Sequence, residues 1–431
     1  MAKQDRTKAL EEHLLPLSST VGEHGLRIGG CDVAALAEEF GTPLFIYDEV
    51  HLRTRCRETV EVFGSHVAYA SKAFLCRAMA RLVNEEGLGI DVASGGELDV
   101  ALAGGVDPKR VVFHGNNKST AELSFALEAG VGRIAVDSFD ELERLAQLTK
   151  DRAQPQPIWL RITPGVEAHT HEYISTGQDD SKFGFTVSSG LAQKAVEMAR
   201  ATPGLQLAGI HAHIGSQVFR IESFHEAALV IAKFFAPLGL DELCVGGGLG
   251  VAYMNGEQNP SVVAWGDAVA AAIAEAGIGD EVEIHVEPGR SLVAQAAITV
   301  YRVGTVKVLD GLRTYVAVDG GMSDNPRPVL YGAGYEAFLV REPLAERPLA
   351  TRIVGKHCES GDVIIPDGYL PADVKVGDLL ATPVTGAYGY AMASTYNRAT
   401  RPAVLFVADG KARLVLRRET YADLSSLDVA P

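Results

Sequence analysis

A short apolar run followed by a helix-forming stretch recurs along the chain from Val67 to Arg290. The runs are rich in valine and isoleucine, end in polar or glycine residues, and precede stretches rich in alanine, leucine and glutamate. They are VAYASK (67–72), GIDVASGGE (89–97), VVFHGNN (111–117), RIAVDS (133–138), IWLRITPG (158–165), LAGIHAHIGS (207–216), ELCVGGG (242–248) and EIHVEPGR (283–290). Strands that alternate with helices form parallel sheets, and eight such units over about 225 residues predict a (β/α)8 barrel.

The stretches between the runs have the spacing of amphipathic helices. Leu142, Leu145 and Leu148 line one helical face, and either Asp137 or Ser138 can cap the start of that helix. An open, doubly wound sheet would show the same alternation. A closed barrel is favoured because the runs number eight and because polar residues follow nearly every run, where the catalytic groups of a barrel gather.

The pattern changes beyond about Thr305, where strand-like runs alternate with turn signals such as Asp409-Gly410. These runs are RTYVAVDGG (313–321), ATRIVGKHCESGDVI (350–364), DLLATPVTG (378–386) and RPAVLFVADGKARLVLRRET (401–420). Helical stretches are scarce there, so the sequence predicts an all-β second domain.

Three parts of the chain follow from these patterns. We expect an N-terminal segment (1–45) that packs with the β domain, a barrel domain (46–305) and a C-terminal β domain (306–431). The polar stretch HTHEYISTGQDDSKFGF (169–185) is long for a loop, and we expect it to be mobile or to contact a partner.

Composition and charge exclude several protein classes. The chain has 431 residues, 47% hydrophobic and 22% charged, which is typical of a globular protein. The net charge of -16 argues against nucleic-acid binding and a polybasic membrane anchor. No apolar run approaches the roughly 20 residues that span a bilayer. The five cysteines are an odd number without C-x-x-C spacing, so we expect a cytoplasmic protein with neither disulfides nor structural zinc.

Candidate chemistry lies at the ends of the predicted strands. Lys72 ends the first run, where its amine could form a Schiff base, although a single lysine is more often a solvated surface residue. The glycines Gly246–Gly248 follow the seventh run, at a barrel position that often binds phosphate through backbone N–H groups. Taken alone, they fit a tight turn equally well.

Two further groups of polar residues follow the sixth and eighth runs. Glu287 could pair with a ring nitrogen and Arg290 could bind a phosphate or a carboxylate, although a surface ion pair is the simpler explanation. His211 and His213 would share one face of a strand and could bind a metal; alternatively, one imidazole stacks on a cofactor ring or both are hydrogen-bonded core residues. Together, an amine, a phosphate-binding glycine run, a carboxylate and an arginine suit pyridoxal phosphate.

Nine motifs, in this order, give the chain a family resemblance. They are YASKAF, GIDVASGGEL, HGNNKS, HIGSQ, GGGLG, EPGR, DGGMSDNPRPVLY, GKHCESGD and GAYGYAMAS. From about Pro43 to Val429 the sequence resembles the pyridoxal-phosphate-dependent decarboxylases of the alanine-racemase-like barrel fold. The DNPRP and CESGD segments resemble the diaminopimelate decarboxylase branch rather than the ornithine or arginine decarboxylases.

The resemblance implies a role for each matching residue. Lys72 would hold the cofactor covalently, His213 would stack on its ring, and Cys358 would return a proton to the α-carbon. The cofactor contacts implied in addition are Asp91, Ser216, Gly247, Gly248, Glu287, Gly289, Arg290 and Tyr388. The substrate contacts implied are Arg290, Arg327, Tyr331, Glu359 and Tyr388. No metal is implied.

The resemblance also implies an activity and an assembly. The reaction is decarboxylation of meso-2,6-diaminopimelate to L-lysine, the last step of lysine biosynthesis. The enzyme would be a homodimer with shared active sites, in which Cys358 and Glu359 come from the neighbouring subunit. The alternatives are a decarboxylase of a related amino acid and a metal-dependent barrel hydrolase that uses His211 and His213.

Overall fold

The computed structural model describes residues 9–23, 25–165 and 180–429. The chain forms two compact units, which are described separately below. One comprises Met1–Arg55, Val251–Gln258 and Leu292–Pro431, and the other comprises Cys56–Gly250 and Asn259–Ser291. Most of the 169–185 loop lies outside the described residues. The domain bounds expected from the sequence remain a prediction.

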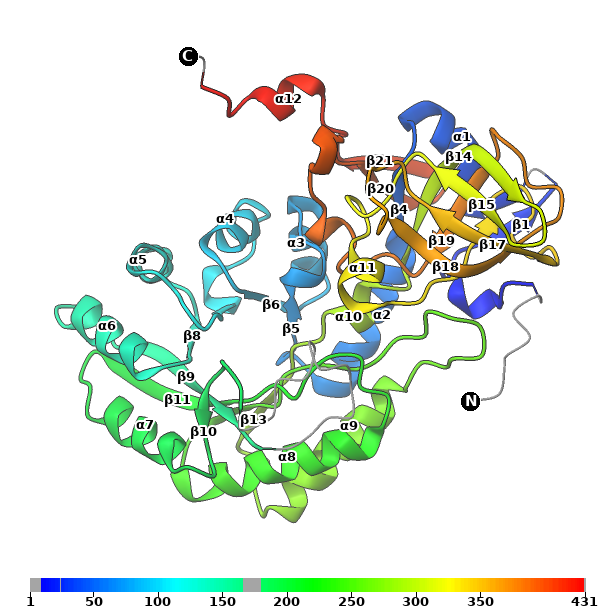
Figure 1. Cartoon of the computed structure of the whole chain (residues 1–431). Coiled ribbons are helices and arrows are strands. Elements are labelled where there is room, and N and C mark those ends of the chain that lie inside the picture. The colour runs from blue at the N-terminus through cyan, green and yellow to red at the C-terminus, as the bar shows by residue number, and fades with distance from the viewer. Residues whose placement is uncertain (1–8, 24, 166–179, 430–431) are drawn as a thin grey trace. The chain divides into compact units, whose positions relative to one another are not determined.

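Eight parallel strands form the barrel unit (Figure 1). They are β5 (Ala68–Ala70), β6 (Gly89–Val92), β7 (Val111–Phe113), β8 (Arg133–Val136), β9 (Gln156–Thr163), β11 (Leu205–His211), β12 (Glu242–Cys244) and β13 (Glu283–His285). Their order in the sheet follows their order in the chain, and the short β10 (Phe185–Thr186) pairs with β9. Each strand lies within one of the eight predicted runs or overlaps it, so the predicted strands are confirmed.

The barrel closes between its last and first strands. A parallel bridge joins Val67 to Val286. Around this bridge, the N–H of Ala68 donates to the carbonyl of Val286 at 2.9 Å, and the N–H of Val286 donates to the carbonyl of His66 at 3.0 Å. This seam is short, because β5 and β13 contain only three residues each.

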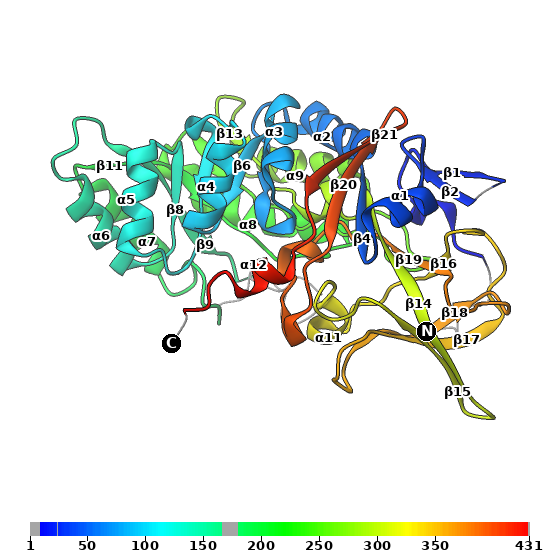
Figure 2. The same ribbon diagram turned by 90° about the horizontal axis from the view of Figure 1, so that it is seen from above.

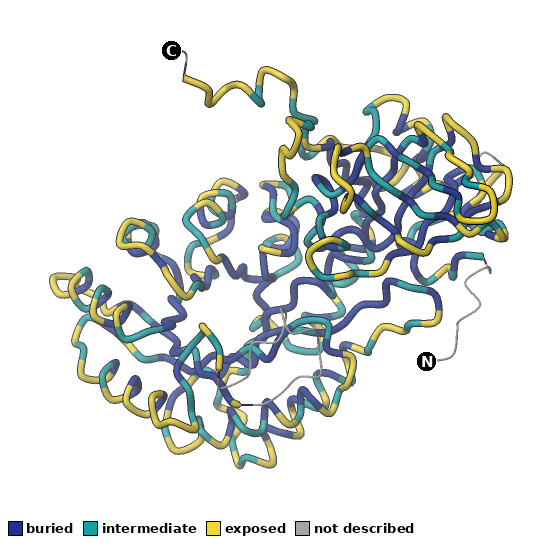
Figure 3. Tube along the Cα trace, viewed as in Figure 1, coloured by how far each residue is buried: buried dark blue, intermediate teal, exposed yellow. Residues whose placement is uncertain are grey.

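Helices surround the strands, with their outer faces exposed and the strands buried (Figure 3). They are α3 (Arg77–Glu85), α4 (Gly95–Ala103), α5 (Thr120–Ala129), α6 (Phe139–Thr149), α7 (Leu191–Arg200), α8 (Ile221–Phe235) and α9 (Val262–Glu275); α2 (Glu49–Phe63) and α10 (Arg290–Val293) cross the unit boundaries. Serines begin several of these helices: the side chains of Ser94, Ser119 and Ser138 accept backbone N–H bonds as N-caps.

Side chains from several strands fill the barrel interior. Val112, Trp159, Ala208 and Cys244 form one buried cluster, and they come from β7, β9, β11 and β12. Trp159 is fully buried, and its ring lies nearly parallel to that of His211, with 6.3 Å between the centroids. The interior is therefore packed with side chains, as expected for a barrel of this size.

A mostly antiparallel sheet dominates the other unit. Its strands run in the order β18 (Val363–Leu370), β17 (Leu349–Val354), β15 (Arg313–Val318), β14 (Ala297–Leu309), β4 (Leu44–Asp48), β20 (Ala403–Ala408) and β21 (Lys411–Leu416); β19 (Leu379–Pro383) pairs with β14, and β16 (Phe338–Leu339) with β19. β4 lies between β14 and β20 (Figure 2). Asp409 and Gly410, both at positive φ, form the β20–β21 turn, as the sequence predicts.

Smaller elements complete this unit. They are β1 (Thr20–Gly22), β2 (Gly25–Ile28), β3 (Cys31–Asp32), α1 (Val33–Phe40), α11 (Arg327–Tyr331) and α12 (Tyr421–Ser425). The predicted fold class, a (β/α)8 barrel with a mainly β second domain, is thus confirmed. Among the described residues, no helix combines the length and apolar character needed to cross a bilayer.

Candidate active site

The residues singled out in the barrel gather at the carboxyl ends of its strands. Lys72 follows β5 and is exposed, and Asp91 lies in β6. His213 and Ser216 follow β11, Gly247 and Gly248 follow β12, and Glu287, Gly289 and Arg290 follow β13. Parallel strands place these ends at one mouth of the barrel, where the active sites of such barrels lie.

Glu287 is a buried charge at this mouth that is held by two histidines. Its side chain is buried, and its two carboxylate oxygens contact His114 Nε2 at 2.7 Å and His211 Nε2 at 2.9 Å. Burial alone would raise the pKa of Glu287, but the two imidazoles hold it well below its ordinary range. Glu287 is therefore a buried anion whose free lone pairs can accept further hydrogen bonds.

The charges of this network and of Lys72 affect the pKa values of two other groups, Asp91 and His213. Asp91 lies 4.0 Å from His114, and burial raises the pKa of Asp91 to about 6. Burial, together with the positive charge of Lys72, lowers the pKa of His213 well below its ordinary value. His213 is therefore a neutral, flat ring near the lysine amine.

The glycine run leaves no room for side chains. A Cβ on Gly247 would lie 2.1 Å from the carbonyl oxygen of Glu287, and one on Gly248, at φ +119°, would lie 2.4 Å from that of Gly215. Beside this run, the Arg290 guanidinium donates to the Ser216 hydroxyl at 3.0 and 3.2 Å. Backbone, hydroxyl and cation thus combine as an anion site requires.

The β unit holds a second set of the predicted residues. Arg327, the first residue of α11, is buried; it donates to the Tyr335 hydroxyl and lies 4.4 Å from the Tyr253 ring centroid. Tyr331 ends the same helix, and Tyr388, at φ 59°, is half-buried. An arginine held rigidly among aromatic rings can present its fork to a carboxylate.

Cys358 and Glu359 are exposed on a loop of the β unit that is fixed by its neighbours. The N–H of His357 donates to Asp362 at 2.8 Å, and His357 Nε2 pairs with the Ser323 hydroxyl at 2.8 Å. The N–H of Cys358 donates to the Asn397 side chain at 3.2 Å. Hydrogen bonds to Asp362, Ser323 and Asn397 therefore fix the loop that carries the exposed thiol.

Comparisons with known proteins show the family to which the chain belongs. The pyridoxal binding domain of pyridoxal-dependent decarboxylases matches residues 49–294, more than half of the chain. Diaminopimelate decarboxylase of Mycobacterium tuberculosis is 46% identical over 97% of this chain and 98% of its own length, and that of Bacillus subtilis is 47% identical over 96% and 97%. The chain belongs to the diaminopimelate decarboxylase family.

Solved structures of the family share the fold. The M. jannaschii diaminopimelate decarboxylase superposes with a TM-score of 0.89 at 35% identity, covering 96% of this chain and 98% of that one. The Helicobacter pylori enzyme, complexed with L-lysine, has a TM-score of 0.84 at 32% identity, covering 92% and 98%. Crystal structures of this family therefore match the chain over nearly its whole length.

The residues at the barrel mouth fit a pyridoxal cofactor. The glycine run offers backbone N–H groups where a Cβ would fill the space, and Ser216 and Arg290 lie beside it. The buried Ser71 hydroxyl, next to Lys72, has no hydrogen-bond partner among the described residues. A buried anion, a neutral ring and an exposed amine complete the set of groups that such a cofactor requires.

One pairing considered from the sequence is not found, and one residue was missed. β11 ends at His211, so His213 is beyond the strand, and its Nδ1 contacts the N–H of Gly247 at 3.2 Å. Among the described residues, the groups able to hold a metal do not include His213. His211 and His213 therefore do not form the ligand pair that a metal-dependent hydrolase would need, and the family also contradicts that alternative.

His114, which directly follows β7, was not among the candidate residues predicted from the sequence. The signal that could have indicated it is its place in the HGNNKS motif at the end of a predicted strand.

Glu287→Gln removes the negative charge that raises the pKa of His114 above its ordinary 6.5. Since burial alone lowers this pKa, we expect the His114 pKa to fall below 6.5 in the cofactor-free variant, measured by NMR titration of histidine Cε1 protons. Glu275→Gln, at an exposed carboxylate beside His225, should leave the His114 titration unchanged. Equal His114 pKa values in wild type and Glu287→Gln would contradict the assigned network.

Proposed function

We propose that this protein decarboxylates meso-2,6-diaminopimelate to L-lysine and CO2, with pyridoxal phosphate as its cofactor, in the last step of lysine biosynthesis. The observation that carries the proposal is similarity over nearly the whole chain to diaminopimelate decarboxylases, two of whose solved relatives contain L-lysine. The buried Arg327 supports the substrate class, because a second carboxylate distinguishes this amino acid from simple diamine precursors.

Each group at the barrel mouth has a role in holding the cofactor. Lys72 would attach the cofactor covalently, and Ser216, Gly247, Gly248, Gly289 and Arg290 would hold its phosphate. When bound, the cofactor would supply an electron sink for the pair released as the carboxylate leaves. Glu287, held ionised by two imidazoles, would keep a ring nitrogen protonated, and the neutral His213 would stack on the ring.

The β unit supplies specificity and a proton. Arg327 binds the distal carboxylate in a bidentate fashion, with Tyr331 and Tyr388 as further contacts, and Glu359 binds the distal amine. Cys358 donates its thiol proton to the α-carbon after CO2 has left. Because Cys358 and Glu359 are exposed in the single chain, we propose that they complete the site of a second subunit in a homodimer. A cytoplasmic location remains a prediction.

The activity is tested by incubating the purified protein with the separate stereoisomers of diaminopimelate. We expect release of CO2 and formation of L-lysine from the meso isomer, and no turnover by Lys72→Ala. Borohydride reduction followed by peptide mapping should find the pyridoxyl label on Lys72 in wild type, and Lys150→Ala, at an exposed lysine, should retain both label and turnover. A label on another residue would contradict the assignment of Lys72.

Arg327→Lys tests the basis of specificity. A lysine cannot form the two parallel bonds of a guanidinium, so we expect kcat/KM for meso-diaminopimelate to fall by roughly 30-fold or more, the equivalent of at least about 2 kcal/mol for a lost buried charge pair. Steady-state kinetics measures this loss. Arg352→Lys is the matched control, at an arginine of the β unit whose side chain donates to the backbone carbonyl of Pro366 at 3.0 Å. An equal kcat/KM for Arg327→Lys and wild type would exclude the distal-carboxylate role.

Mixed dimers test whether active sites are shared. Lys72→Ala and Cys358→Ala chains should each be severely impaired alone. When the two are co-expressed, half of the randomly formed dimers are mixed, and each mixed dimer has one intact site out of two. Co-expression should therefore restore about a quarter of wild-type activity. Co-expression of Lys72→Ala with Glu287→Ala should restore nothing, since both residues come from one barrel. Equal rates in the two mixtures would contradict shared sites.

A further inference from the structure

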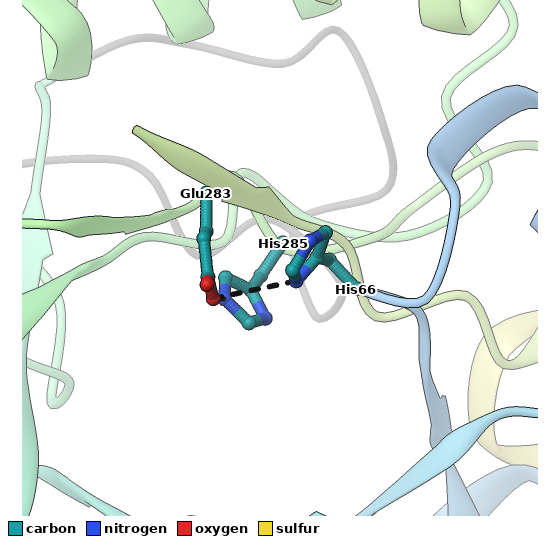
Figure 4. A group of neighbouring side chains, drawn as sticks. All are labelled: His66, Glu283 and His285. Atoms are coloured by element: carbon teal, nitrogen blue, oxygen red, sulfur yellow. Dashed lines mark ion pairs between the residues drawn. The ribbon is translucent and has the colours of Figure 1, made fainter. Parts of the chain in front are cut away.

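Three potential metal ligands meet at the end of the barrel opposite its active-site mouth (Figure 4). His66 lies two residues before β5, and Glu283 and His285 lie in β13. Residues at i and i+2 of a strand share one face, so β13 presents a carboxylate and an imidazole together. All three belong to the barrel unit, and none of them is used by the proposed reaction.

Their separations differ from those of direct hydrogen bonds. His66 Nδ1 and His285 Nε2 each lie 3.4 Å from the same oxygen, Oε2 of Glu283. Hydrogen bonds of this kind measure about 2.7–3.2 Å. Two ligand atoms that are each about 2.0–2.1 Å from a tetrahedral zinc ion lie about 3.3–3.4 Å apart. The two distances to Glu283 thus match those between ligands of a common cation, and the ligand atoms of all three residues lie within 4.8 Å of one another.

The state of His285 supports this interpretation. Its Nε2 is buried and has no hydrogen-bond partner among the described residues, which is costly for a polar atom. An unpartnered imidazole nitrogen that faces a carboxylate can become a ligand of a shared cation.

The other group able to hold a metal differs in its spacing. His114, His211 and Glu287 are buried and are joined by direct contacts of 2.7 and 2.9 Å, which are the distances of hydrogen bonds and not those between ligands of one ion. At the opposite end, His66 and Glu283 are partly exposed, so water can reach the cluster and occupy a fourth position.

We propose that His66, Glu283 and His285 bind one zinc-like divalent cation, with water as the fourth ligand. The ion joins β13 to the chain segment that enters β5, which is the seam where the barrel closes through the short Val67–Val286 bridge. It therefore stabilises the closed barrel and takes no part in decarboxylation.

Zinc titration of the cofactor-loaded protein, after dialysis against a chelator, tests the proposal. By isothermal calorimetry, wild type should bind one more zinc ion per chain than His66→Ala. Glu283→Gln, which preserves the shape of the side chain, should weaken this site by more than the about 10–100-fold that follows loss of an outer-shell partner. Zinc should raise the unfolding temperature of wild type and leave that of both variants unchanged.

A matched control separates this site from ordinary surface binding. His225 lies 3.5 Å from Glu275 in a pair with a single histidine, and His225→Ala should bind zinc as wild type does. Decarboxylation by chelator-treated His66→Ala should match that of wild type. The proposal is overturned if wild type binds no zinc, if His66→Ala retains the full stoichiometry, or if Cys358→Ser removes the same site.

Discussion

The buried carboxylate of Glu287 constrains three strands of the barrel at once. A charge removed from water is costly unless it is paired and hydrogen-bonded, and here two imidazoles supply the bonds. His114 follows β7, His211 ends β11, and Glu287 follows β13, so three strands far apart in the sequence must meet in register. A one-residue slip of β11 would turn His211, its last residue, to the other face of the sheet. The same register that satisfies this charge also fixes the positions of the proposed catalytic groups around it.

Backbone geometry supplies the second constraint. Gly247 and Gly248 lie so close to the carbonyls of Glu287 and Gly215 that any side chain would force the loops apart. This close approach brings the loop after β12 against the loop after β13, beside the Arg290–Ser216 pair. An anion site made largely from backbone N–H groups therefore depends on the packing of neighbouring strand ends, and not on one flexible side chain.

Local signals allowed the eight strands, the helix cap at Asp137 or Ser138 and the residues at strand ends to be predicted, because each depends on a few neighbouring residues. Partnerships between distant residues could not be predicted in this way. His114 meets a carboxylate 173 positions away, and β4 pairs with β14 across more than 240 residues. The His211–His213 pair illustrates a different limit: the two-residue period holds only within a strand, and β11 ends at His211.

The two strands that close the barrel, β5 and β13, are followed by three of the residues placed in the proposed site. β5 is followed by Lys72, and β13 is followed by Glu287 and Arg290, so the proposed attachment residue, the buried anion and a proposed phosphate ligand flank one seam. This seam has few hydrogen bonds, since both strands are short. Any opening there would separate the amine from the anion directly, whereas an opening between other strands would not. A cation held by His66, Glu283 and His285, as proposed above, would therefore secure this seam at the end away from the proposed catalytic groups.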